Sequence, residues 1–493
     1  MTAVDLSAVA RVVGIQVSYK DLRGRNITFL PQRVVIMGQG NTGVTYPDTK
    51  KEITNAMQAG VVYGYGSPVH LAARQLFPDN GDGVGTVPVT IYPLQEGVSA
   101  TVASGDITPS GSQLANTQAY ARIGGVKSQA FSVLIGDNAA AIIAKMITAI
   151  NAIAEMPVIA TNGTTKVNLA SKWKGESANG IYTEVVGDDL DVAFAITQCT
   201  GGTVDPDPTD ALALIGNIWE TCIVSCLDLQ NTDALDVYQT YGDGRWGALV
   251  KKPLTGVFTG ANDADYTDVT VITDARKSDR INSVIHAPDS PMLPLQVAAR
   301  AVARIARQAN NNPPVDYASD GKLQGIVPGA AEFDLDYTDR DFIVKKGCST
   351  LELIDGVLEL SDVVTCYHPD GDTLPAYRYV VDIVKIQQIL FNIKIVFESS
   401  NWRGKPLLPD ADATTNDEAR KPKDAVSAVC EKYDGLGLAA IIADVAFAKA
   451  NTFASISESN PKRIDLTTTA KIAGNTNIIS VDLDFGFYFG QAA

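Results

Sequence analysis

Histidine and cysteine, which most often build metal centres and nucleophilic sites, are scarce in this chain. Only His70, His286 and His368 occur among 493 residues, together with six scattered cysteines. We therefore expect the cysteines to be reduced, buried small hydrophobic residues of a cytosolic product. The chain has no uncharged apolar run of about eighteen residues, and its start has no long apolar run. Neither a transmembrane helix nor a signal peptide is therefore predicted.

Positive charge is also in short supply. The chain has 40 Lys and Arg against 56 Asp and Glu, a formal net charge of −16. This acidic balance argues against binding a phosphate backbone through bulk electrostatics, so no nucleic-acid partner is predicted. With 45% hydrophobic and 19% charged residues, the composition is that of a globular protein. The length predicts about three domains.

A glycine-rich stretch, GQGNTG (residues 38–43), is the strongest catalytic candidate. It has the G-x-G-x-x-G pattern and follows an apolar run, as in dinucleotide-binding folds. However, VTYPDTKK follows instead of a helix, and the acidic residue expected about twenty residues later is missing. Val44 occupies the position of a P-loop lysine. We therefore predict a plain loop and keep a dinucleotide-binding enzyme as a remote alternative.

Other catalytic and metal patterns are incomplete. Cys366 and His368 could supply two metal ligands, but no second pair has ligand spacing. The stretch GYGSPVH lacks the second glycine of a nucleophile elbow. The sequence therefore predicts no catalytic, cofactor or metal site, and a protein that is not an enzyme.

The first two thirds of the chain indicate an α/β domain with an insertion. Between residues 100 and 202 the sequence changes to short strands, turns and one Ala/Ile-rich helix over 138–155, which indicates an inserted domain. Apolar runs and helical periods predict the other elements. They are strands over 33–38, 86–94 and 221–229, and helices from about Lys51, after Ser67 as N-cap, and over 294–308.

The last third begins with a hairpin signal. LELIDGVLEL (residues 351–360) places Asp355 and Gly356 between two apolar runs, which strongly favours a tight β-turn. VVTCYH is expected to extend the second strand. YRYVVDIVKIQQILFNIKIVF predicts a long apolar helix.

Both chain ends carry strand-like sequences in which apolar and polar residues alternate. Each strand either closes the protein's own sheet or finds its neighbours in another subunit. Because exposed strand edges are hazardous, we predict head-to-tail strand addition between subunits. The apolar positions are Val13, Ile15, Val17 and Tyr19 at the N-terminus, and Ile479, Val481, Leu483, Phe485, Phe487 and Phe489 at the C-terminus.

Three arginines form a candidate charged interface. Arg300, Arg304 and Arg307 fall at positions i, i+4 and i+7 of the helix predicted over 294–308, on one face. Two interpretations stay open. The stripe is either a solvated surface with local carboxylate partners or half of a contact with an acidic neighbouring subunit.

Several segments, taken in order along nearly the whole chain, resemble the contractile tail sheath proteins of myoviruses, most closely those of Mu-like phages. The segment GCSTLELIDGVLELSDVVTCY departs from the family pattern at three places. Cys348 occupies an aliphatic position, Cys366 replaces a Thr, and residues 360–362 lack an Arg that many relatives have. The segments are VVIMGQGNTG, YGYGSPVHLAARQLF, NLASKWKGESANGIY, CTGGTVDPDP and GCSTLELIDGVLELSDVVTCY.

The resemblance implies a structural protein without cofactors. Such a subunit is expected to polymerise with itself as stacked hexameric rings around a tail tube and to contract, driving the tube through the host envelope for genome delivery. Its arms are expected to join a sheet in the C-terminal domain of neighbouring subunits. The resemblance also implies tube, baseplate and terminator proteins as partners, and no insertion into a membrane. The subunit is expected to be part of the virion and to assemble in the host cytoplasm. A bacteriocin-like or secretion-type contractile machine is the alternative.

The fold expected overall is α/β (α+β) and multidomain. It combines a mixed-sheet core domain, an inserted β-rich domain, a C-terminal α+β domain and extended terminal β-strand arms. The expected parts are an N-terminal arm (1–21), a discontinuous middle α/β domain (22–99 and 203–330), an inserted outward-facing domain (100–202), a C-terminal sheath domain (331–455) and a C-terminal arm (456–493).

Overall fold

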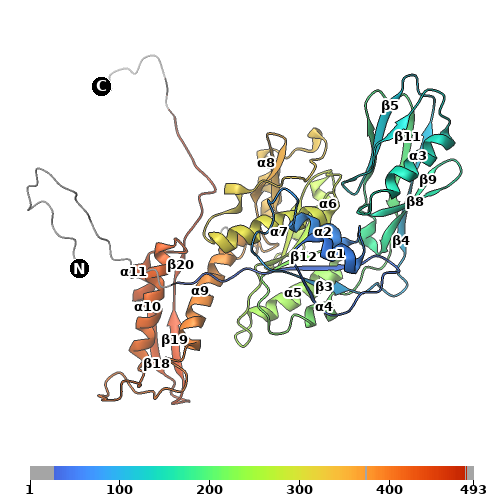
Figure 1. Cartoon of the computed structure of the whole chain (residues 1–493). Coiled ribbons are helices and arrows are strands. Elements are labelled where there is room, and N and C mark those ends of the chain that lie inside the picture. The colour runs from blue at the N-terminus through green and yellow to red at the C-terminus, as the bar shows by residue number, and fades with distance from the viewer. Residues whose placement is uncertain (1–26, 372–374, 484, 486–493) are drawn as a thin grey trace, which may run out of the picture. The chain divides into compact units, whose positions relative to one another are not determined.

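The computed structural model describes residues 27–371, 375–483 and 485, and its internal contacts divide the chain into two units. The first unit holds the described residues between 28 and 399, and the second holds those from 400 onward together with Ile27. Figure 1 shows the elements of both, coloured along the chain. The described residues form helices and several sheets, so the mixed α/β architecture is confirmed. The finer division into arms and domains stays a prediction.

The first unit is built on a six-stranded sheet in the order β14-β13-β12-β1-β3-β2. Neighbouring strands are parallel except β2, which is antiparallel to β3. Parallel strands covered on both faces are apolar throughout, which explains the continuous apolar runs in the sequence. The strands are β1 (Val34–Gln39), β2 (Lys51–Ile53), β3 (Val89–Leu94), β12 (Cys222–Ser225), β13 (Gly256–Ala261) and β14 (Asn282–His286).

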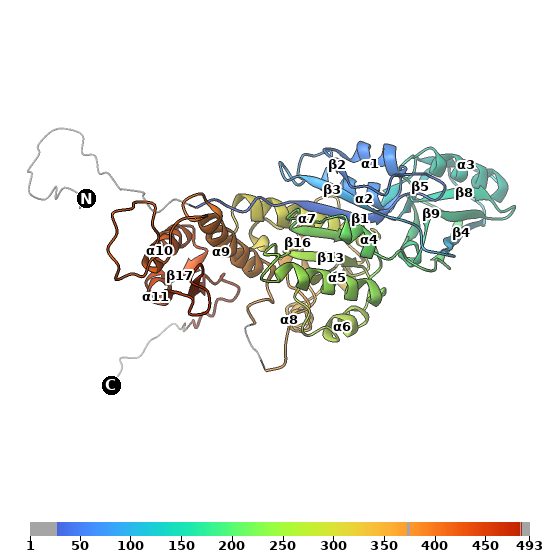
Figure 2. The same cartoon turned by 90° about the horizontal axis from the view of Figure 1, so that it is seen from below.

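Helices cover both faces of this sheet (Figure 2). Ile36 and Val224 face one layer of helices, whereas Val35 and Ile223 face the other. The first layer contains α1 (Ala56–Tyr63), α2 (Pro68–Leu76) and α7 (Pro294–Asn311), and the second contains α4 (Thr209–Ala213), α5 (Thr232–Trp246) and α6 (Tyr266–Asp274). Helix α2 starts as predicted, because the Ser67 side chain accepts a hydrogen bond from the N–H of His70.

Two local predictions are wrong. The helix expected from about Lys51 is instead β2, which pairs with β3, and α1 begins only at Ala56. Strand pairing with β3 overrides the local helical pattern there. The VVTCYH stretch does not extend its strand, since β16 ends at Asp362 and Val364 forms an isolated bridge to Tyr379.

Residues 102–200 form two four-stranded sheets and helix α3 (Ala139–Asn151). In the sequence they lie between β3 and β12, two strands of the large sheet. One sheet has the order β11-β4-β9-β8, and the other has the order β10-β5-β6 with β7 paired to β5. Their strands are β4 (Val102–Ser110), β5 (Thr117–Ile123), β6 (Val126–Lys127), β7 (Phe131–Val133), β8 (Val158–Asn162), β9 (Val167–Lys174), β10 (Thr183–Gly187) and β11 (Ala193–Thr200).

The first unit ends with a hairpin and two helices. Strands β15 (Thr350–Ile354) and β16 (Val357–Asp362) are joined by Asp355 and Gly356, whose φ angles are +50° and +78°. Two consecutive positive φ angles are what a tight type I′ turn needs, so the hairpin prediction is confirmed. The helices are α8 (Tyr337–Lys345) before the hairpin and α9 (Val380–Glu398) after it.

The second unit is a small α+β body. Helix α10 (Pro422–Leu438) packs against a two-stranded sheet of β18 (Thr452–Ile456) and β19 (Ile464–Thr468). A second antiparallel pair joins β17 (Ile442–Ala443) to β20 (Lys471–Ile472), and α11 (Val445–Ala450) lies between β17 and β18 in the sequence.

Candidate assembly surfaces

The C-terminal segment, defined here as residues 473–483 and 485, contains no strand or helix. Four of its predicted strand-face side chains are largely exposed: Ile479 by 77%, Val481 by 75%, Leu483 by 75% and Phe485 by 87%. This part of the chain therefore closes no sheet of its own molecule, and its role between subunits stays a prediction. Phe487 and Phe489, and Val13, Ile15, Val17 and Tyr19 at the other end, lie outside the described residues.

The β18–β19 sheet of the second unit has unpaired outer edges among the described residues. Helix α10 packs against both strands, while the Phe453 side chain of β18 is 63% exposed. Unpaired N–H and C=O groups along such an edge are a template for another strand. This sheet is therefore the candidate acceptor for strand addition.

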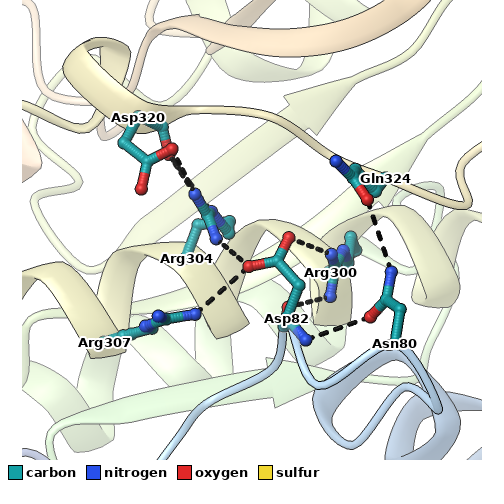
Figure 3. Close-up of polar contacts among 7 residues, drawn as sticks. All are labelled: Asn80, Asp82, Arg300, Arg304, Arg307, Asp320 and Gln324. Atoms are coloured by element: carbon teal, nitrogen blue, oxygen red, sulfur yellow. Dashed lines mark hydrogen bonds and ion pairs between the residues drawn. The ribbon is translucent and has the colours of Figure 1, made fainter.

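The three arginines of α7 converge on one carboxylate, that of Asp82 in the loop between α2 and β3 (Figure 3). Arg300 donates from Nη2 to Asp82 Oδ2 at 2.8 Å and also binds the Asp82 carbonyl. Arg304 and Arg307 share Oδ1, with Arg307 Nη1 at 3.1 Å. Arg304 also binds Asp320, with Nη2 2.6 Å from Oδ1. The stripe therefore has local carboxylate partners.

Burial distinguishes the three arginines. The side chains of Arg300 and Arg304 are 0% and 6% exposed, whereas that of Arg307 is 42% exposed. Removal from water lowers the pKa of Arg300, and the nearby Asp82 carboxylate opposes that shift. The two buried arginines therefore make their contacts within the chain. Arg307 keeps an exposed edge, and the proposed charged interface stays a prediction that now concerns Arg307.

Sequence reasoning missed Asp82 and Asp320 as the partners of the stripe. Asp82 lies in DNGDG (residues 79–83), whose glycines and polar residues indicate a turn but not its target. In the structure, the Asp82 N–H donates to Asn80 Oδ1 at 3.0 Å, and Asn80 Nδ2 contacts Gln324 Oε1 at 3.5 Å. These contacts hold the loop so that its carboxylate faces α7.

The glycine-rich stretch at residues 38–43 begins with the last two residues of β1, and its remaining residues, 40–43, form the loop that follows the strand. From Gly43 the chain leads to β2 and not into a helix, so this loop offers a pyrophosphate no helix N-terminus. At Gly40 a Cβ would collide with the Tyr46 ring and the Tyr63 carbonyl. The Asn41 N–H donates to that Tyr63 carbonyl at 2.8 Å.

The histidines are buried and bound within the fold. Burial lowers the pKa of His70 to about 4, and its Nδ1 accepts a hydrogen bond from the Gly66 N–H at 3.1 Å. His368 hydrogen-bonds the Cys366 carbonyl at 2.7 Å and Asp274 at 3.0 Å. Among the residues that the structure describes, no group of three or more His, Cys, Asp or Glu is placed to hold a metal ion.

All six cysteines are free thiols. Five are buried, as expected, and Cys430 in α10 is partly exposed. Burial raises the pKa of the Cys199 and Cys222 thiols to about 11 and about 12. Within the described ranges, no helix has the length and apolar character needed to cross a membrane.

Comparison with known proteins confirms the resemblance to Mu-like tail sheath proteins, although no protein-family model matches the chain. The chain is 22% identical over 438 residues to the Mu-like prophage FluMu tail sheath protein of Haemophilus influenzae, covering 87% of each chain. Similar solved structures include a sheath tail protein from Listeria innocua, with a TM-score of 0.48 and 11% identity over 92% of this chain and 95% of the other. The contracted PVC sheath of an extracellular contractile injection system gives a TM-score of 0.49 and 9% identity, with coverage of 97% and 99%.

Proposed function

We propose that this chain is a structural subunit of a contractile tail sheath. The observation that carries the proposal is its similarity to a Mu-like prophage tail sheath protein over 87% of both chains. The subunit polymerises as stacked hexameric rings around a tail tube, and contraction drives the tube through the host envelope for genome delivery. Its partners are further copies of itself and the tube, baseplate and terminator proteins of the virion, with which it assembles in the host cytoplasm.

The C-terminal segment supports this proposal physically. It presents four apolar side chains at alternating positions to solvent, and the β18–β19 sheet has outer edges that no described strand pairs with. A donor strand and an acceptor edge on the same chain associate head to tail, which builds rings and helical filaments. In this proposal the segment of one copy adds to the β18–β19 sheet of a neighbour.

The pairing within the second unit also suggests where the arm begins. β19 pairs with β18, and β20 pairs with β17, so residues up to Ile472 belong to the body of this unit. We propose that the part of the C-terminal arm that reaches a neighbour starts after Ile472. Residues 1–21 act as the second arm, and the inserted residues 100–202 face outward.

Negative-stain electron microscopy of the full chain beside a variant lacking residues 478–493 tests the proposal. We expect hollow tubes from the full chain and monomers from the shortened one. Circular dichroism melting of both proteins is the control. The described residues of the removed part form no strand or helix, so we expect the folded units to stay intact. Tubes from the shortened chain would overturn the arm model, and discrete particles from the full chain would overturn the sheath function.

A further inference from the structure

Arg307 lacks a carboxylate of its own. Three guanidinium groups contact the single carboxylate of Asp82, and among the described residues the only other acid bound by the stripe is Asp320, which contacts Arg304. Arg307 shares Asp82 Oδ1 with Arg304. Three positive charges against two negative charges leave the cluster with an excess charge of one. The excess lies toward Arg307, because only this arginine of the three is substantially exposed.

A small pocket lies beside this exposed edge. It has a volume of about 150 Å³ and is lined by Arg304, Arg307, Gln308, Asn311, Tyr317 and Asp320. The carboxamides of Gln308 and Asn311 add neutral donors to the guanidinium groups. A guanidinium fork and a carboxylate match in a two-pronged hydrogen bond. The pocket is therefore suited to one carboxylate side chain.

The same unit carries an acidic face where α6 and α8 meet. The two helices are in contact through Tyr266, whose hydroxyl donates to Asp339 at 3.1 Å and whose ring packs on Phe342. Five exposed carboxylates at the N-terminal ends of these helices, or just before them in the sequence, form no ion pair with any described residue, and we call them the acidic face. They are Asp265, Asp268, Glu332, Asp334 and Asp336.

We propose that Arg307 and its pocket receive a carboxylate from the acidic face of a second copy of the chain. The inference rests on the proposed self-assembly and adds a lateral contact to the strand exchange of the arms. Two copies of a chain with a net charge of −16 repel one another unless their contacts place opposite charges together. A basic pocket and an acidic face on different surfaces give a head-to-tail contact, as the polymer requires.

The test compares Arg307→Glu with Lys51→Glu, an equal charge change at an exposed lysine of β2 that forms no ion pair among the described residues. Assembly of the full chain is measured by pelleting at about 0.1 M and about 1 M NaCl, where the screening length falls from about 10 Å to about 3 Å. We expect wild type and Lys51→Glu to pellet at the lower salt and to lose polymer at the higher. Arg307→Glu is expected to stay soluble at both. Its melting transition should stay cooperative, at a slightly lower temperature because the bond to Asp82 is lost.

A charge swap identifies the source of the carboxylate. The triple change Asp268→Lys, Glu332→Lys and Asp334→Lys avoids the two helix-capping aspartates, and it is expected to restore pelleting of Arg307→Glu. Pelleting of Arg307→Glu at the wild-type level and salt dependence would overturn the inference, and failure of the triple change to restore it would overturn the acidic face as the source. If the full chain forms no polymer at all, the proposed function fails and the inference fails with it.

Discussion

Strand β1 and the C-terminal segment have strand-forming sequences but opposite surroundings. All six residues of β1 are buried, and residues 34–37 pair with strands on both sides, whereas Ile479, Val481 and Leu483 are exposed by three quarters or more. The sequences differ in period, because residues 34–37 of β1 are continuously apolar, whereas apolar residues of the C-terminal segment alternate with Ser480 and Asp482. A continuous run needs cover on both faces, which its own chain provides. A strand with alternating apolar residues needs cover on one face only. Within its described residues, the C-terminal segment receives no such cover from its own chain.

The largest expected effect is on β1. Ile36→Ala removes a fully buried side chain whose strand neighbours are Val224 and Ile91. We expect the free energy of unfolding of the first unit to fall by about 4 kcal/mol, because the sheet cannot collapse around the cavity. Urea unfolding followed by circular dichroism measures this loss. A loss below about 1 kcal/mol would remove the contrast between β1 and the C-terminal segment.

The next effect concerns the arginine cluster. Asp82→Ala leaves Arg300, which is fully buried, without its carboxylate. We expect the free energy of unfolding to fall by about 3 kcal/mol, since a buried charge is then uncompensated. Asp79→Ala in the same loop is the matched control, because Asp79 is exposed and forms no ion pair among the described residues. Equal losses in the two variants would show that the cluster does not stabilise the fold.

A pH-dependent effect of intermediate size follows from His70. Its pKa in the folded chain is about 4 against an ordinary value of 6.5, so the unfolded chain binds the proton more readily between these two values. The stability provided by neutral His70 is present above pH 6.5 and is lost as the pH falls toward 4. From pH 7 to pH 5 we expect wild type to lose about 2 kcal/mol more than His70→Gln. Parallel pH profiles of the two proteins would contradict this expectation.

The smallest effect on stability is expected in the C-terminal segment. Val481→Asp should change the free energy of unfolding by less than about 0.5 kcal/mol, because the side chain is exposed. The same change should reduce tube formation, because a charge would enter the apolar pocket of a neighbour. Asp482→Asn, on the opposite side of the alternation, is the control. Normal tubes from Val481→Asp, counted in micrographs, would mean that this side chain stays in solvent.

Features with a local cause could be predicted from the sequence. The Asp355–Gly356 turn and the Ser67 cap depend on residues a few positions apart, and the structure contains both. The helix expected from Lys51 failed because β3, almost forty residues away, recruits those residues as a strand. Asp82 was not found because it lies 218 residues before Arg300, and no local pattern encodes such a pairing. Contacts between copies are hard to predict from the sequence for a related reason, since the contacting residues belong to another molecule.

The unequal burial of the cysteines makes the native thiols a chemical reporter. A small thiol reagent should label the partly exposed Cys430 rapidly, while the five buried thiols react only when the surrounding structure opens. All five lie in the first unit, four of them in or beside the large sheet and the β15–β16 hairpin: Cys222, Cys226, Cys348 and Cys366. Their labelling rate would therefore follow opening of the first unit, and the Cys430 rate would follow access to α10 in the second. Mass spectrometry of partly labelled protein could record both rates in one sample, without any engineered probe.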